Sequence, residues 1–190
     1  MPHVAIVQIK GLTPYSQSKP HQTEKLNKES PDDFEKRTWK EKLHYDEQGI
    51  IFIPPMAFKN CIAEAAKYLG KKIPGKRGAT YTKHFEAGVL VTDPSLLGIH
   101  KDLIVGDWIF TPSDGVKGSG KRVHKCFPII PPGWQAKVEF LILDDIITEG
   151  VFVEHLEQAG QLIGIGRFRP RNGGYYGRFV IEKFDWKQMS

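Results

Sequence analysis

One stretch near the end of the sequence organises the chain, and residues 161–179 read Gln161-Leu162-Ile163-Gly164-Ile165-Gly166-Arg167-Phe168-Arg169-Pro170-Arg171-Asn172-Gly173-Gly174-Tyr175-Tyr176-Gly177-Arg178-Phe179. The stretch combines glycines, arginines and aromatic residues, and it contains no acidic residue. Glycine tolerates positive φ and allows a ligand to approach the backbone. Arginine presents a planar cationic fork that suits phosphate, and aromatic rings offer faces on which bases stack. The composition therefore favours a loop that binds an anionic, base-bearing polymer over a plain turn with solvated arginines.

The charge of the whole chain supports this interpretation by its distribution more than by its sum. The 190 residues include 27 Lys and Arg against 22 Asp and Glu, a formal net charge of +5. Residues 71–84 and 115–125 form two further basic stretches without acids, while the acids gather in 24–47 and 144–157. Such segregation favours a polyanionic partner.

The length and composition are typical of one globular domain, which we expect to span residues 1–190. Cys61 and Cys126 lack metal-ligand spacing and indicate no disulfide framework. The sequence shows no secretory signal and no apolar run long enough to cross a membrane, so we expect a cytoplasmic protein without membrane contact.

The hydrophobic periodicity predicts an α+β domain with a ferredoxin-like βαββαβ core and an antiparallel sheet. A buried strand is expected over 4–10, a helix over 56–69 that Gly70 ends, an alternating strand over 134–143, a helix from Thr148 or Glu149, and a last strand over 179–184. The helices would cover one face of the sheet and leave the other free for a ligand.

Two insertions interrupt this core, at about 16–42 and 111–128. The first is a polar excursion that we expect to be mobile, with a short helix starting at Ser30-Pro31. The second is a glycine-rich basic loop between extended segments 103–110 and 121–130, which predicts a projecting hairpin. We further expect a hairpin over 43–53, a short strand or ribbon over 79–85, and a strand over 87–91.

Two motifs resemble those of the RAMP superfamily, which supplies backbone subunits of CRISPR effector complexes. The junction Gly49-Ile50-Ile51-Phe52-Ile53-Pro54-Pro55-Met56-Ala57-Phe58-Lys59 is similar to the family's hairpin-to-helix signature, although Pro55-Met56-Ala57 stand where the family has Gly-Ser-Ser. The stretch from Ala159-Gly160 to Phe179 resembles the family's glycine-rich loop after the second helix.

The resemblance implies a protein that binds single-stranded nucleic acid, usually RNA, with copies stacked head to tail or within a larger nucleoprotein complex. It implies that Lys59 and the loop 164–178 lie near the nucleic-acid backbone, and that the hairpin around 117–125 acts as a thumb between bases. No metal or cofactor is expected. Together with the basic stretches, the residues expected to contact nucleic acid are Lys59, Lys76, Arg77, Lys121, Arg122, Lys125, Gly164, Gly166, Arg167, Phe168, Arg169, Arg171, Tyr175, Tyr176 and Arg178.

Two alternatives remain open from the sequence. The protein could be a metal-independent RNA endonuclease, for which His21, with Tyr15 and Lys19 nearby, is the best candidate acid or base. It could also be a protein-interaction module that mimics or blocks a CRISPR-type nucleoprotein complex. The Gly164-x-Gly166 pair follows a predicted helix, which argues against a dinucleotide-binding site.

Overall fold

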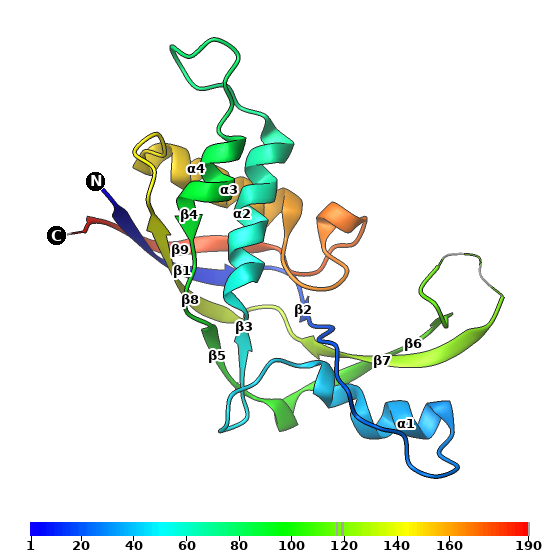
Figure 1. Ribbon diagram of the computed structural model, residues 1–190. Coiled ribbons are helices and arrows are strands. Elements are labelled where there is room, and N and C mark those ends of the chain that lie inside the picture. Colours follow the sequence, from blue (N-terminus) through cyan, green and yellow to red (C-terminus); the bar gives the residue numbers. More distant parts are fainter. Residues whose placement is uncertain (117, 119, 190) are drawn as a thin grey trace.

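The fold is built on a four-stranded antiparallel sheet (Figure 1), seen in a computed structural model that describes residues 1–116, 118 and 120–189. In spatial order the strands are β4 (Val89–Leu90), β8 (Gln135–Ile142), β1 (His3–Gly11) and β9 (Phe179–Gln188). Helix α2 (Pro55–Leu69) connects β1 to β4, and α4 (Glu149–Gln158) connects β8 to β9. This is the strand order of a βαββαβ core, so the predicted α+β, ferredoxin-like fold class is confirmed.

Helices α2, α4 and the short α3 (Thr82–Gly88) cover one face of the sheet (Figure 1). The buried residues of β1 alternate, as expected for a strand with one covered face. Phe58 of α2 packs edge-on against Phe140 and Phe179 of the sheet. Gly70 ends α2 with φ at +55°, as its position after the last apolar residue predicts.

His155 of α4 is a buried histidine that packs between α4 and α3. Its ring stacks on Phe85 at 4.4 Å and its Nδ1 lies 2.7 Å from Val151 O, while Nε2 has no hydrogen-bond partner among the described residues. Burial lowers the pKa of His155, and the hydrogen bond to Val151 opposes this shift only in part.

We therefore expect stability to fall as pH drops below the ordinary histidine pKa of about 6.5. In this pH range the unfolded chain binds a proton at His155 that the folded protein does not. The free energy of unfolding is therefore unaffected by His155 above about pH 6.5, and it decreases as the pH falls from there toward the lowered pKa. His155→Phe should flatten the fall in urea-unfolding free energy between about pH 7 and pH 5. Some slope should remain, because burial also lowers the pKa of His44. An unchanged slope would contradict this role of His155.

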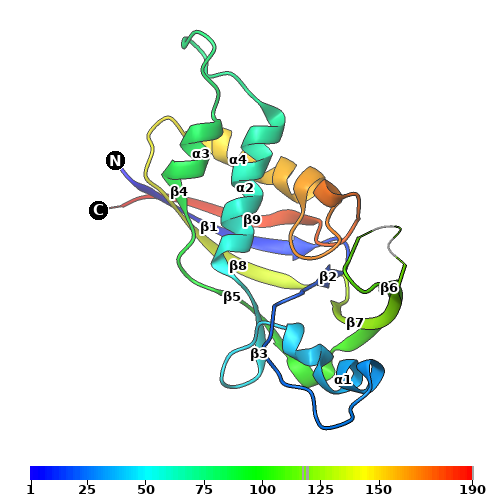
Figure 2. The same cartoon turned by 45° about the vertical axis from the view of Figure 1, so that its right-hand side comes forward.

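A second sheet extends away from the core. In it β7 (Arg122–Ile130) pairs with β6 (Val105–Pro112) and with the short β2 (Tyr15–Ser16). The β6–β7 hairpin projects from the molecule (Figures 1 and 2), as expected. Lys117, which was expected in its tip, lies outside the described residues.

The polar excursion is packed onto this hairpin. Helix α1 (Pro31–Thr38) starts at Ser30, whose side chain accepts a hydrogen bond from the Asp33 amide, and it continues into the 3-10 turn η1 (Trp39–Lys42). Lys42 forms a largely buried ion pair with Glu35 and donates to Cys126 O of β7 at 2.7 Å. The second half of the segment expected to be mobile is thus held in place by β7.

Three local expectations differ from the structure. Residues 82–85 of the expected ribbon instead begin helix α3 (Thr82–Gly88), in which Phe85 packs on His155. The turn at Asp46–Gly49 closes, but β3 (Ile50–Ile53) takes β5 (Ser95–His100) as its main partner. The 3-10 turn η2 (Lys101–Leu103) then leads into β6. The predicted strand over 87–91 is shortened to β4.

Within the described part of the chain, no helix is long and apolar enough to cross a membrane.

Candidate nucleic-acid interface

The glycine loop, residues 164–178, is fixed by its own backbone and by the segment that follows β1. It leaves the π-helical turn η3 (Ala159–Ile163) and contains the 3-10 turn η4 (Pro170–Asn172). The amide of Arg167 donates to Ser16 O at 2.8 Å, and that of Gly177 donates to Pro14 O at 2.7 Å. A Cβ on Gly166 would lie 2.4 Å from Ser16 O. The absence of a side chain at Gly166 therefore allows the backbone at Ser16 to pack directly against the loop.

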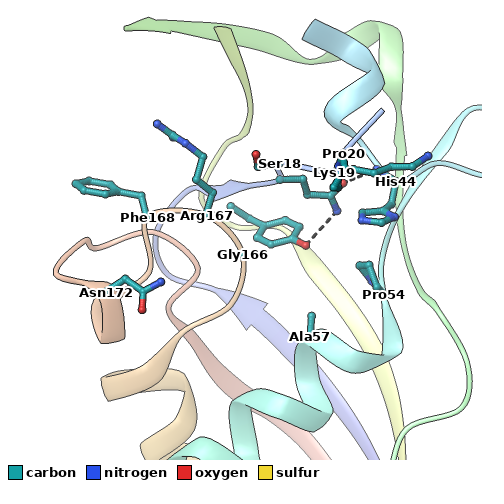
Figure 3. A pocket seen from close by; sticks show the side chains of 12 residues that line it. Ser18, Lys19, Pro20, His44, Pro54, Ala57, Gly166, Arg167, Phe168 and Asn172 are labelled. Atoms are coloured by element: carbon teal, nitrogen blue, oxygen red, sulfur yellow. Dashed lines mark hydrogen bonds between the residues drawn. The ribbon is translucent and has the colours of Figure 1, made fainter. Parts of the chain in front are cut away.

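The first hollow lies on one side of this loop and has a volume of about 450 Å³. Arg167, Phe168 and Asn172 of the glycine loop form one wall in Figure 3, and residues 18–20 with His44 form the opposite wall. Tyr15, Gln17, Pro54, Ala57 and Gly166 complete the lining. None of these described lining residues is acidic, although Asp107 of β6, outside the lining, interacts with the charge of Arg167.

The groups in the first hollow differ in their charge at neutral pH. Lys19 is exposed, whereas Arg167 is half-buried and its Cζ lies 3.7 Å from the centre of the Phe127 ring. Burial lowers the pKa of Arg167, although guanidinium stays protonated in proteins. Burial, followed by the nearby charge of Lys19, lowers the pKa of His44, so His44 is neutral there. The hollow therefore offers two cations and a neutral imidazole.

The second hollow lies between α2 and η4 and has a volume of about 680 Å³. Lys59, Lys67, Arg169 and Arg171 line it together with Glu64 and Glu86. Glu64 Oε2 lies 2.8 Å from Arg169 Nη1, and Glu64 Oε1 lies 3.1 Å from Arg171 Nε. Arg169 and Arg171 thus have a carboxylate partner that comes from helix α2 and not from the loop. The expectation that the arginines of the loop have no acidic partner is wrong for these two.

Three aromatic rings form the outer part of the glycine loop. The rings of Phe168, Tyr175 and Tyr176 lie 4.7–5.5 Å from one another in edge-on pairs. Phe168 and Tyr175 are 45% and 53% exposed, which leaves ring surface accessible to a ligand. Phe168 has a φ of +56°, a strained conformation for a bulky residue, which the hydrogen bond from the Tyr176 amide to Phe168 O helps to hold.

The hairpin carries its cations next to an aromatic ring. Arg122 Cζ lies 5.8 Å from the Phe110 ring centre, and Phe110 is 55% exposed. Lys125 Nζ is 3.3 Å from Ser113 O, and Lys121 is exposed. This surface is distinct from both hollows, but Phe127 and Arg167 join its base to the glycine loop.

Other expected site residues lie elsewhere. Lys76 and Arg77 are exposed in the loop after α2 (top of Figure 1), whereas Lys59 is in its first turns. A helix of this length separates its ends by roughly 20 Å. The Arg178 backbone is bonded to Leu12 and Thr13, beside the start of β9. Sequence reasoning had not placed Lys19 and His44 in the interface, although the absence of acids over residues 10–23 could have pointed to Lys19.

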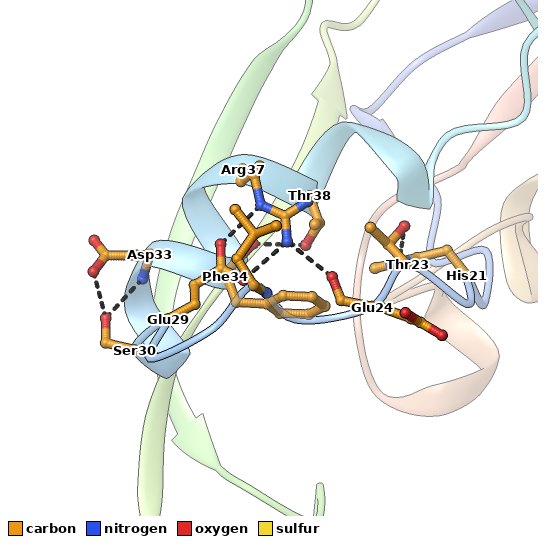
Figure 4. Close-up of polar contacts among 10 residues, drawn as sticks. His21, Thr23, Glu24, Glu29, Ser30, Asp33, Phe34, Arg37 and Thr38 are labelled. Carbon is orange, nitrogen blue, oxygen red and sulfur yellow. Dashed lines mark hydrogen bonds and ion pairs between the residues drawn. The ribbon is translucent and has the colours of Figure 1, made fainter.

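The candidate acid or base His21 lies beside a threonine hydroxyl and an aromatic ring. Its Nδ1 lies 3.1 Å from Thr23 Oγ1 and its ring stacks near Phe34 on the exposed excursion (Figure 4). Tyr15 is buried and accepts a hydrogen bond from Gln17, and burial raises its pKa. Among the described residues, no three His, Cys, Asp or Glu side chains gather as a metal site.

The uncovered face of the main sheet was also expected to be free for a ligand. Its exposed side chains carry charges of both signs, with Lys137 and Glu139 on β8 and Lys183 and Asp185 on β9. Lys10 and Glu182 lie 3.6 Å apart on it. Such a surface lacks the cationic bias that the two hollows and the hairpin show.

Solved structures share this fold. A chain in the cryo-EM structure of the type III-B Cmr-beta bound to cognate target RNA aligns with a TM-score of 0.61 at 16% identity, over 98% of this chain and 61% of that chain. The crystal structure of Cmr6 from Pyrococcus furiosus aligns with a TM-score of 0.50 at 14% identity, over 95% and 99%. No protein-family model and no curated protein matches the sequence. The chain therefore shares its fold with these two solved chains, and this agrees with the fold that the resemblance to the RAMP superfamily implies.

Proposed function

We propose that this chain binds single-stranded RNA across the glycine loop, as a subunit of a larger RNA–protein assembly. The observation that carries the proposal is the first hollow, where Lys19 and Arg167 stand on opposite walls without an acidic residue in the lining. Fixed cations that neutralise phosphates supply most of the affinity for a polyanion. The ring of Phe168 beside them adds a face for a base.

Helix α2 adds a fixed partial charge to the same hollow. Its N-cap is Pro54, which offers no side-chain hydrogen bond, and its first turn contains no acidic residue. The positive end of the helix dipole therefore faces the hollow, which Pro54 and Ala57 line. A phosphate between Lys19 and Arg167 would gain from this end as well.

The remaining cations suggest a path for the strand. From the first hollow it would pass the exposed rings of Phe168 and Tyr175, and the basic hairpin would flank it on the other side. Lys76 and Arg77 would meet only a strand that extends along α2 to its far end. The Cmr-beta structure, which shares the fold, is bound to target RNA, and this favours RNA as the polymer. We propose that copies lie head to tail along it, as the resemblance to the RAMP superfamily implies.

Replacing Lys19 and Arg167 together by glutamine should weaken binding of a single-stranded RNA by at least about tenfold. Each lost phosphate contact should also reduce the slope of log K against log salt by about 0.7. A fluorescence-anisotropy titration at several salt concentrations measures both quantities. The matched control is Lys137→Gln with Lys183→Gln. It removes the same number of positive charges from the uncovered face of the main sheet, outside the first hollow.

Arg167→Lys separates charge from packing, because it keeps the cation but not the planar contact with Phe127. We expect this variant to retain most of the salt slope. Equal losses in the double variant and the sheet-face control would show that only net charge matters. An affinity that is flat in salt for the unaltered protein would contradict the proposal.

A further inference from the structure

The ion pairs of Glu64 have the geometry of an occupied phosphate site. We infer that the Glu64 carboxylate holds, in the second hollow, the position that a phosphate group of the bound strand takes, and that it is displaced when the strand binds. The inference rests on the proposed function and adds a second contact point and a device that limits affinity. Glu64 would then act as an internal competitor for RNA.

Two guanidinium groups converge on one anion in this hollow. Arg169 Nη1 contacts Glu64 Oε2 at 2.8 Å, and Arg171 Nε contacts Glu64 Oε1 at 3.1 Å. Arg169 is the N-cap of η4 and Arg171 lies within this turn, so the two arginines are close together in the chain. Such forks match the oxygens of a phosphate as well as those of a carboxylate. The arrangement therefore suits a phosphodiester that replaces the side chain.

The rest of the hollow favours a nucleic-acid strand over a lone anion. Lys59 and Lys67 of α2 line the same space, so its cations outnumber Glu64 and Glu86 even before displacement. Tyr68 is 56% exposed, and Arg171 Cζ lies 5.7 Å from its ring centre. An exposed ring next to guanidinium groups provides a face for a base beside a contact for its phosphate.

Partial exposure makes the exchange feasible. The side chains of Glu64, Arg169 and Arg171 are 29%, 23% and 47% exposed. Ion pairs that remain in contact with water are weak, so a strand anchored in the first hollow can compete with Glu64 for the arginines. A short anion without that anchor competes poorly. Glu64 would thus select for ligands that fill both hollows.

Glu64→Gln tests the inference, since glutamine keeps the size of the side chain and removes its charge. We expect single-stranded RNA to bind this variant roughly tenfold more tightly, because the arginines become free for charge-assisted hydrogen bonds. The matched control is Glu86→Gln, which removes the same charge from the same hollow. Glu86 does not hold the two arginines, so its variant should gain about twofold at most by the general effect of charge.

A double-mutant cycle separates displacement from structural support. Arg169→Gln with Arg171→Gln should weaken RNA binding only slightly in the unaltered protein, where Glu64 occupies the arginines. In the Glu64→Gln background the same pair should remove the whole gain. Thermal unfolding of each variant shows whether the glycine loop keeps its stability, so that a loss of fold is not read as a loss of contact.

The binding results for Glu64→Gln and Glu86→Gln distinguish the inference from the proposed function. Equal gains in Glu64→Gln and Glu86→Gln, or weaker binding by Glu64→Gln, would overturn the inference and leave the role of Lys19 and Arg167 untouched. Tight binding by Glu64→Gln alone, with little by the unaltered protein, would support the inference. Absence of RNA binding in both proteins would overturn the inference and the proposed function together.

Discussion

Replacing Gly177 by alanine is expected to lower the free energy of unfolding by about 3 kcal/mol or more. Gly177 has a φ of +71°, which costs strain for any residue with a Cβ. That Cβ would also lie 1.9 Å from Ile165 O. Because this is a backbone atom, the collision can be relieved only if the main chain moves. The amide and carbonyl of Gly177 bond to Pro14 and Ile165, so the backbone of three segments would have to shift.

Gly173→Ala provides the matched control in the same loop. Gly173 has a φ of +79°, but among the described residues no atom beyond its own chain neighbours lies within 4 Å of the place that a Cβ on this residue would take. This variant therefore carries the strain without the collision and should lose only about 1 kcal/mol. Urea unfolding of both proteins measures the difference. Equal losses would mean that the close approach of Gly177 to Ile165 contributes nothing to stability.

Lys42→Met is expected to cost about 2–4 kcal/mol and to release α1 from the hairpin. The methionine leaves the Glu35 carboxylate, which is 12% exposed, without its cation. Glu35 also accepts a hydrogen bond from the Cys126 amide at 2.6 Å, so it cannot turn freely toward water. Removing one partner of a largely buried pair is costly because the other charge stays desolvated.

The comparison variant is Lys40→Met, two residues earlier. Lys40 pairs with Asp102 at 3.1 Å, but the two side chains are 36% and 62% exposed. Such a surface pair contributes less than about 1 kcal/mol. Limited proteolysis of the segment 31–42 reports release of α1, and urea unfolding reports the total loss. If the two variants behaved alike, the buried pair would not be what anchors α1.

The core of the fold could be predicted because local signals and the global arrangement agree. The helix over 56–69 shows its period in Phe58, Ile62 and Ala66, and Gly70 marks its end. The failures involve tertiary contacts. The sequence Ser95–His100 contains Gly98 at a φ of +67° and has no clear alternation, so its pairing with β3 leaves no local trace. Helix α3 depends on the packing of Phe85 against His155, which distant residues supply.

In the candidate site, too, local features could be predicted from the sequence and tertiary contacts could not. Composition alone singled out the glycine loop, since its arginines and rings are consecutive in the sequence. It could not show that Glu64 holds Arg169 and Arg171, because helix α2 brings that carboxylate from about a hundred residues away. Nor could it show that Lys19 and Arg167 line the same hollow, which depends on hydrogen bonds between residues 14–16 and the loop.

The ring of Phe127 has a consequence for the order of folding. Lys42 Nζ and Arg167 Cζ lie 4.4 Å and 3.7 Å from its centre, so the excursion, the hairpin and the glycine loop meet at one side chain. Closing the long stretches of chain between these residues costs entropy that only the finished contact recovers. We therefore expect local turns and helices to form earlier, and the hairpin to take its final direction in one of the last steps, together with the segment that leads to α1.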